Sequence, residues 1–281
     1  MKKIVRSKKM IIGIVILSMV TLFVLLGLDQ SLKIVTYNVT TNKINNEVKI
    51  AVITDLHSCV YGENQIELLS ALESESPDLV LLGGDIFDDR MSHDGAIALL
   101  KGIQNRYPSY YVTGNHEIWS GEQAAIKRLV KAYGITVLEG EKKEVEVNGN
   151  KITVTGIDDP SINQIASEFE NQSHQIIKAQ ETTSDSYNVL LIHRPLHALT
   201  YLDGSYDIAV SGHAHGGQWR LPFLINGLLA PDEGFFPKYA GGRYGIGDRT
   251  LIVSRGLARE STRIPRLYNQ PELVFINLTS K

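Results

Sequence analysis

Residues 49–57 read KIAVITDLH, an apolar and β-branched run that ends in two side chains able to bind a metal ion. The same arrangement recurs four times along the chain. DLVLL precedes Gly83-Gly84-Asp85, SYYVT precedes Gly114-Asn115-His116-Glu117, NVLLI precedes His193, and DIAV precedes Ser211-Gly212-His213-Ala214-His215. Because side chains at the carboxyl ends of adjacent strands converge, this repetition predicts one shared site at the edge of a sheet.

Each of these five clusters is weak evidence when taken alone. A Gly-Asp pair is an ordinary turn signal, and Asn-His after Gly marks a turn more often than a ligand. The segment 212–215 is sharper, because two histidines at i and i+2 can face the same way from a strand. Taken together, eight candidate residues from five strand ends suit two cations that also hold water.

The complete set resembles the calcineurin-like metallophosphoesterase superfamily over roughly residues 33–279. More narrowly, it is similar to the membrane-anchored, single-domain bacterial phosphoesterases of that superfamily. The run Gly-His-Ala-His-Gly-Gly-Gln at 212–218 and the tail Ser254-Arg255-Gly256, Pro265-Arg266 and Pro271-Glu272 carry the narrower resemblance. The resemblance implies a four-layer αββα sandwich that hydrolyses phosphoester bonds.

The resemblance also implies a role for each of the eight residues. One metal takes Asp55, His57 and His215, the other takes Asn115, His193 and His213, and Asp85 bridges them. His116 stays unligated beside the scissile phosphate and protonates the leaving oxygen as a general acid. The usual Gly-Asn-His-Asp reads Gly-Asn-His-Glu here, so we expect Glu117, like Asp88 and Asp89, to orient ligands.

This mixed oxygen and nitrogen donor set contains no thiolate, which suits two divalent ions such as Mn, Fe, Zn or Co. A carboxylate shared by two cations lets them activate a water and hold phosphate oxygens together. The chain has one cysteine, Cys59, so no intramolecular disulfide is possible. We expect Cys59 to be a small buried residue rather than a soft ligand or reactive thiol.

The net charge of −3 hides an asymmetry between the two ends of the chain. Residues 1–28 carry five basic residues and no acidic one, and without those five the chain has 23 basic against 31 acidic residues, a net charge of −8. Such a domain is poorly suited to nucleic acid, whose binding depends on phosphate neutralisation. We expect no nucleic-acid partner.

The N-terminus has the pattern of a signal anchor. Residues 10–28 are uncharged and follow a basic segment at 1–9, and their length is close to the ~20 residues needed to cross a bilayer as a helix. The positive-inside rule places the N-terminus in the cytoplasm and everything after residue 28 outside. A cleaved signal peptide is the alternative, but its apolar core is usually only ~7–15 residues long.

We expect a linker and first strand at 29–45 and the catalytic domain at 46–281, without a second domain. Helical spacing covers 63–76, 92–105, 121–134 and a polar stretch at 161–180, and a hairpin turns at Asn148-Gly149. Strand follows helix in the first half, and strands predominate in the second. That order favours two packed sheets with helices outside.

Residues 220–248 stand apart, because three prolines break any regular element there. The segment still carries large apolar side chains, among them Phe223, Leu224, Ile225, Leu228, Leu229, Phe235, Phe236, Tyr239 and Tyr244. This segment is either a long loop packed on the sandwich or an apolar rim for a lipid-like substrate or the membrane surface. With the anchor, it favours an amphiphilic, cell-envelope phosphodiester or pyrophosphate as the substrate of a monomeric enzyme. A broad phosphomonoesterase and a non-catalytic interaction domain on the same fold are the alternatives.

Overall fold

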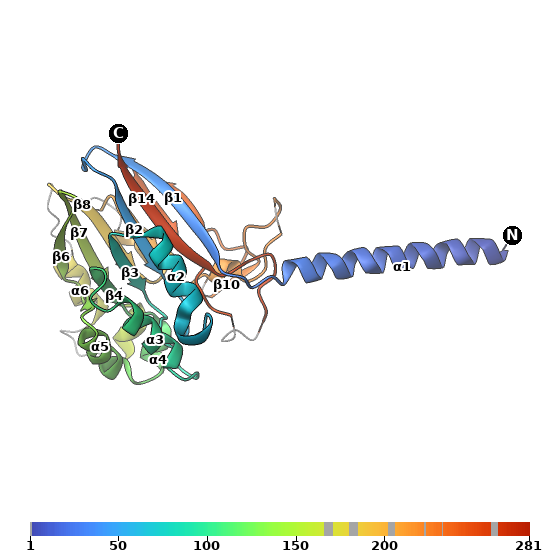
Figure 1. Ribbon diagram of the computed structural model, residues 1–281, viewed down its shortest axis with the longest axis horizontal. Coiled ribbons are helices and arrows are strands. Elements are labelled where there is room, and N and C mark those ends of the chain that lie inside the picture. The colour runs from blue at the N-terminus through green and yellow to red at the C-terminus, as the bar shows by residue number, and fades with distance from the viewer. Residues whose placement is uncertain are drawn as a thin grey trace.

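The computed structural model describes residues 2–165, 171–179, 185–201, 206–221, 223–231, 233–259 and 264–281, with side chains from residue 8 onward. Helix α1 (Lys2–Gly27) projects away from a body built on two packed sheets (Figure 1). Its segment Lys8–Gly27 is long and apolar enough to cross a membrane, although a signal sequence can have the same properties.

The first sheet contains the strands that lead to the predicted Asp55, Asp85 and Asn115. Its order is β1 (Lys33–Thr41), β14 (Glu272–Ser280), β2 (Val48–Ile53), β3 (Leu79–Gly83), β4 (Ser109–Val112) and β5 (Thr136–Val137). Strands β2 to β5 are parallel, β14 runs antiparallel to β2, and β1 runs parallel to β14. The last strand of the chain thus lies between its first two.

The second sheet contains the strands that lead to the predicted histidines. Its order is β12 (Gly242–Ile246), β13 (Arg249–Val253), β9 (Ile208–Ser211), β8 (Tyr187–Ile192), β7 (Asn150–Ile157) and β6 (Lys142–Val147). The four inner strands are parallel, and the edge strands β12 and β6 are antiparallel to their neighbours. A small separate hairpin pairs β10 (Leu229–Ala230) with β11 (Gly234–Phe235).

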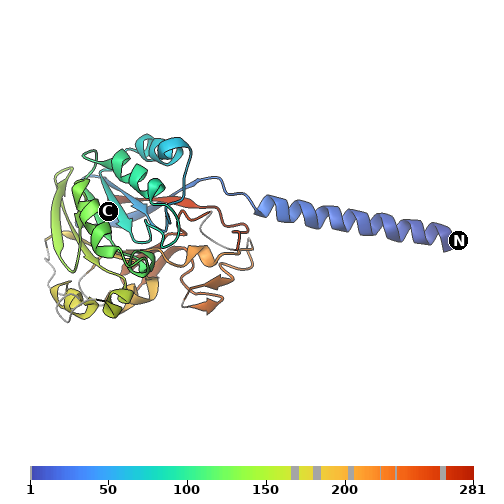
Figure 2. The same ribbon diagram turned by 90° about the horizontal axis from the view of Figure 1, so that it is seen from below.

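Helices connect the parallel strands. The α-helices after α1 are α2 (Ile66–Glu75), α3 (Asp94–Ile103), α4 (Asn115–Trp119), α5 (Gln123–Ala132), α6 (Gln172–Ala179) and α7 (Pro195–Tyr201). Single 3₁₀ turns are η1 (Glu63–Gln65), η2 (Pro160–Gln164) and η3 (His215–Gly217). The second view shows the same body from below, with α1 again clear of it (Figure 2).

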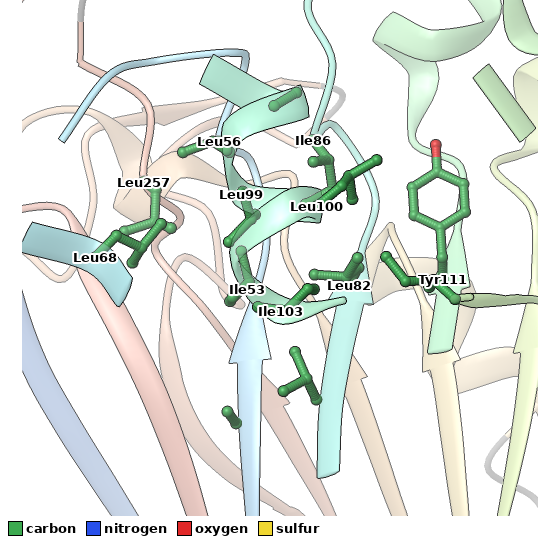
Figure 3. Packing of buried hydrophobic residues seen from close by; sticks show 14 of the residues in the cluster. Ile53, Leu56, Leu68, Leu82, Ile86, Leu99, Leu100, Ile103, Tyr111 and Leu257 are labelled. Carbon is green, nitrogen blue, oxygen red and sulfur yellow. The ribbon is translucent and has the colours of Figure 1, made fainter. Parts of the chain in front are cut away.

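The inner strands of the two sheets are buried on both faces, and the alternation of their side chains separates the cores. In β2, Ala51 and Ile53 face the helices, whereas Ile50 and Val52 face the other sheet. Figure 3 shows Ile53 and Leu82 grouped with Leu99, Leu100 and Ile103 of α3. A third core covers the outer face of the second sheet. The αββα sandwich is therefore confirmed, and Cys59 lies in the first core as expected.

Two expectations from the sequence were wrong. The segment 161–180 is not one helix: η2 begins at Pro160 and is capped by Asp159, which accepts from the Ser161 amide, whereas α6 is a separate helix. Residues 166–170 and 180 lie outside the described residues. In the segment 220–248, β12 forms a regular edge strand, because its backbone completes the exposed side of β13. The prolines therefore do not exclude regular structure from this segment, because the short strands β10 and β11 also lie in it.

A buried carboxylate joins the two sheets beside the strand ends. Asp158, directly after β7, accepts hydrogen bonds from the Thr113 amide and hydroxyl after β4, at 3.1 and 2.7 Å. Its other oxygen lies 2.6 Å from the Lys127 ammonium of α5. Burial opposes the charge on Lys127, but Asp158 and Glu139 outweigh it and raise its pKa. The two sheets and α5 therefore share one buried ion pair.

We expect Asp158→Asn to destabilise the fold by about 3–5 kcal/mol, because Lys127 would keep its charge without its buried partner. Thermal or urea unfolding of the purified full-length chain measures this loss. Lys131→Gln is the control, because Lys131 lies 3.6 Å from Glu139 on the surface and should change stability by less than about 1 kcal/mol. Equal stability of the two variants would show that the buried pair stabilises the fold no more than the surface pair does.

Candidate metal centre

The structure brings the predicted site residues to one edge of the sandwich. Asp55 and His57 follow β2, Asp85 follows β3, and Asn115 and His116 begin α4 after β4, all in the first sheet. His193 follows β8, and His213 and His215 follow β9, in the second sheet. Because the parallel strands of both sheets end at this edge, their side chains meet between the sheets.

Asp85 lies at the centre of this group. Its Oδ2 is 3.2 Å from His193 Nε2 and 3.5 Å from His57 Nε2, so one oxygen faces both sheets. Its Oδ1 accepts from the His116 amide at 2.8 Å. Two clusters of potential ligand atoms, each within 4.8 Å, share this carboxylate: Asp55, His57, Asp85 and His215 form one, and Asp85, His193 and His213 form the other.

Neighbouring groups orient the histidine rings. His57 Nδ1 donates to Asp88 at 3.0 Å, and His193 Nδ1 donates to the Gly83 carbonyl at 2.9 Å, so Nε2 of each ring points inward. His213 Nδ1 lies 3.2 Å from His193 Nε2, and the His213 amide donates to Asp55 at 2.9 Å. Hydrogen bonds of this kind fix the tautomer and the direction of a metal-binding imidazole.

Several inward-facing polar atoms are buried and have no hydrogen-bond partner among the described residues. They include Asp55 Oδ2, His57 Nε2, Asn115 Oδ1 and His215 Nδ1. An unpaired buried polar atom costs roughly 1–3 kcal/mol, so four in one site require an explanation. Oxygen and nitrogen donors from Asp, Asn and His are the atoms that divalent transition metals accept. The residues of these clusters therefore fit divalent cations of this kind.

The electrostatics of the site favour bound positive charge. Burial raises the pKa of Asp85, but His193, His57 and His116 outweigh it and hold that pKa well below the usual value. Burial lowers the pKa of His193, but Asp85 outweighs it and raises that pKa to about 10, so a proton neutralises the pair. Burial lowers the pKa of His213 and His215 well below the usual value, which keeps both in the neutral form that binds metal.

The loops that carry these residues adopt conformations that most side chains avoid. Asp55, His57, Asp85, His213 and His215 all have positive φ, between 46° and 66°. Such positions cost energy and persist at sites where the surrounding structure holds them. Glycines allow the carboxylates to approach: a Cβ at Gly114 would lie 2.2 Å from Asp85 Oδ1, and one at Gly212 would lie 2.3 Å from Asp55 Oδ2.

Glu117 holds the loop after β3. Its buried carboxylate accepts from the amides of Asp85, Ile86 and Phe87 and from that of Gly114, at 2.7 to 3.0 Å. Burial and the nearby Asp85 charge raise its pKa to about 7. Glu117 thus fixes Asp85 through the backbone, as expected of an orienting residue. Because Glu117 belongs to the motif Gly114-Asn115-His116-Glu117, the sequence already indicated it as a residue of the site.

His116 lies at the open side of the group. Its Nδ1 donates to Asp89 at 2.7 Å, its ring lies edge-on to His57 at 4.3 Å between centroids, and its side chain is 24% exposed. Trp119 packs against its other side. The Nδ1 bond leaves Nε2 as the nitrogen that can meet a substrate. Arg194, by contrast, forms a two-point ion pair with Asp159.

Comparison with known proteins agrees with this geometry. The sequence profile of the calcineurin-like phosphoesterases matches residues 48–217, which hold β2 to β9 and every residue of the group. The chain belongs to this family. Metallophosphoesterases are hydrolases, and the resemblance inferred from the motifs is confirmed.

Bacterial and animal metallophosphoesterases are similar along most of this chain. YkuE of Bacillus subtilis is 28% identical over 83% of this chain and 79% of its own. The phosphodiesterase YaeI of Escherichia coli is 25% identical over 82% of both chains. A bovine transmembrane protein with a metallophosphoesterase domain is 26% identical over 88% of this chain and 57% of its own.

Solved structures share the fold at low sequence identity. The 5′-nucleotidase precursor of Thermus thermophilus aligns with a TM-score of 0.51 and 13% identity over 83% of this chain. The NAD nucleotidase of Haemophilus influenzae aligns with a TM-score of 0.50 and 17% identity over 75%. This chain spans 54% and 51% of those two chains, respectively, so the likeness concerns the metallophosphoesterase fold alone.

We expect Asp85→Asn to abolish activity and remove bound metal together, because one carboxylate faces both clusters. Elemental analysis of the purified variant, beside the unchanged chain, measures metal content. Asp89→Asn is a control for general damage near the site, because Asp89 contacts His116 rather than the cluster atoms. Two tightly bound ions with full turnover in Asp85→Asn would refute the bridging position.

Proposed function

We propose that this metallophosphoesterase uses two divalent cations to hydrolyse a phosphodiester or pyrophosphate bond of an amphiphilic, cell-envelope substrate. The observation that carries the proposal is the set of buried, unpaired ligand atoms around Asp85. Asp55, His57 and His215 would hold one cation, Asn115, His193 and His213 the other, and Asp85 both. Bound there, divalent cations would lower the pKa of a water and offset negative charge on phosphate.

The protein's own contribution to bond cleavage is His116. Asp89 accepts from its Nδ1, so a proton on Nε2 can pass to the departing oxygen while Asp89 stabilises the charged ring. The His116 amide also donates to Asp85, which holds His116, the general acid, beside the metal-binding group. Trp119 restricts the ring from the solvent side.

A diester or pyrophosphate is favoured over a monoester by the open edge. Within the described residues, the helices and strands beyond the sandwich are α1 and the small β10–β11 hairpin, so they supply no cap domain to enclose a small substrate. The similarity to the phosphodiesterase YaeI supports the same choice. An amphiphilic substrate is supported by the apolar α1 and by the similarity to proteins named as transmembrane.

The test compares bis-p-nitrophenyl phosphate with p-nitrophenyl phosphate, using the metal-loaded full-length chain in detergent. The proposal expects faster turnover of the diester. Preference for the monoester would favour the phosphomonoesterase alternative. Turnover of neither substrate, despite two bound metals, would favour an interaction domain.

We expect His116→Ala to retain both metals but lose roughly 10²–10⁴-fold in turnover of an alkyl phosphodiester, whose leaving oxygen is basic. Turnover of bis-p-nitrophenyl phosphate should fall much less, because p-nitrophenolate leaves without a proton. Both rates are measured on one preparation, so each serves as a control for the other. An equal fall in the two rates would show that His116 acts on the attacking water or on phosphate charge instead.

We also propose that α1 remains attached and spans the membrane once, with its basic N-terminus in the cytoplasm and the sandwich outside. A reporter active only outside the cytoplasm, fused after Lys281, should then be active and accessible to protease on intact cells. The same fusion with Lys8→Glu and Lys9→Glu should show reduced export, because the charge bias is weaker. A reporter signal confined to the cytoplasm would contradict the orientation, and a soluble product lacking α1 would contradict the uncleaved anchor.

A further inference from the structure

A second cavity lies at the end of α1, apart from the predicted metal ligands. Its volume is about 480 Å³, and it joins positive charge to apolar surface. Its lining includes Lys33, Arg220, Phe223, Leu224, Arg255 and Tyr268. Lys33 belongs to β1, and Arg220, Phe223 and Leu224 follow η3 along the chain. Arg255 and Tyr268 lie before and after residues 260–263, so no single sequence motif contains the lining.

The charged groups of this cavity are basic. Arg255 lies 3.3 Å from the buried Glu272, but within the described chain no carboxylate lies within 4 Å of Lys33 or Arg220. Arg220 instead donates to the Gly216 carbonyl at 3.1 Å and to Asn226. Burial and Arg255 lower the pKa of Arg220 to about 10, which still leaves it charged at neutral pH. The cavity therefore carries excess positive charge that suits an anion.

The cavity lies at the level where α1 leaves the body. Tyr268 packs against Phe23 with 4.8 Å between ring centroids, and its hydroxyl donates to the Phe23 carbonyl at 2.6 Å. The Tyr268 amide donates to the carbonyl of Gly27, the last residue of the apolar segment. If α1 spans the bilayer, Tyr268 lies at its interface, where tyrosine is commonly enriched.

Large apolar side chains face solvent in the lining of the cavity and in the segment that follows it along the chain. Phe223 is fully exposed and Leu224 is 82% exposed, and Phe235 and Phe236 near the β10–β11 hairpin are 71% and 66% exposed. Figure 1 shows this hairpin beside the α1 end of the body, and Figure 2 shows the same neighbourhood. Apolar residues grouped at a basic surface are typical of proteins that rest on an anionic membrane.

We propose that this cavity binds the phosphate headgroup of an anionic phospholipid in the leaflet where α1 ends, while Phe223 and Leu224 enter that leaflet. A lipid is favoured over a soluble anion because charge and apolar surface occur together, and because the cavity is continuous with the membrane end of α1. The proposal rests on the membrane position of α1, not on the hydrolytic reaction.

The contact has a consequence for the metal centre. Arg220 holds the Gly216 carbonyl, and Gly216 directly follows His215. Asn269, next to Tyr268, donates to the His215 carbonyl at 2.7 Å. A bound headgroup would therefore fix the loop that carries His215 and hold the site at a constant orientation to the membrane.

Lipid binding is tested with the full-length chain in detergent micelles, by native mass spectrometry. The ligands are dihexanoyl-phosphatidylglycerol, dihexanoyl-phosphatidylcholine and inorganic phosphate. The test variant is Lys33→Gln with Arg220→Gln, and Lys33→Gln alone covers the case in which Arg220 is needed for folding. The control variant is Arg128→Gln with Lys143→Gln, which removes the same charge from α5 and β6. Thermal unfolding confirms that each variant is folded.

The unchanged chain and the control should retain phosphatidylglycerol in preference to phosphatidylcholine. The double variant should bind phosphatidylglycerol about 30-fold more weakly, and Lys33→Gln alone about fivefold, as expected for basic residues near a membrane surface. Asp85→Asn should bind it normally, which separates this proposal from hydrolysis.

Three results would overturn the proposal. Equal binding by the test and control variants would exclude the basic cavity as the site. Equal affinity for inorganic phosphate and phosphatidylglycerol would indicate a soluble anion. Lipid retained only by dimers would indicate that a second copy of the chain covers the surface.

Discussion

The central constraint on this protein is a buried carboxylate between two sheets. Asp85 is almost wholly inaccessible, yet His193 and His57 from opposite sheets lie within 3.5 Å of one of its oxygens. A charge in that position is stable only when positive groups surround it. The raised pKa of His193 allows its imidazole to supply positive charge, and bound divalent cations would satisfy the same requirement. The need for positive charge beside Asp85 accounts for the histidines, for Asn115 and for the glycines around them.

Several neighbouring residues offset the unfavourable free energy of this strained, buried site. Five of the predicted site residues have positive φ, and two glycines leave room for the carboxylates. Glu117 compensates by accepting four backbone amides, and Asp158 links the loops after β4 and β7 to α5. These buried hydrogen bonds are strong because little water competes with them. They hold the two sheet edges at a fixed separation, as a site with ligands from both sheets requires.

The surface toward α1 extends this organisation beyond the metal-binding group. The loop 215–220 begins with a candidate ligand, His215, and ends with Arg220 in the basic cavity. Tyr268 and Asn269 connect the same loop to the last turn of α1. The segment 220–248 is thus partly a sheet edge and partly exposed surface, because β12 pairs with β13 whereas Phe223 and Leu224 contact solvent.

The sequence by itself determined the local features. Continuous apolar, β-branched runs predicted the strands, and polar residues directly after them predicted which side chains meet, because strand ends converge. Other features depended on the tertiary structure. The start of η2 at Pro160 reflects the cap by Asp159, which composition does not reveal. The pairing of β1 with β14 and the meeting of Lys33 with Arg220 join residues far apart in sequence. Such contacts depend on which sheet faces pack together, and no local periodicity encodes that choice.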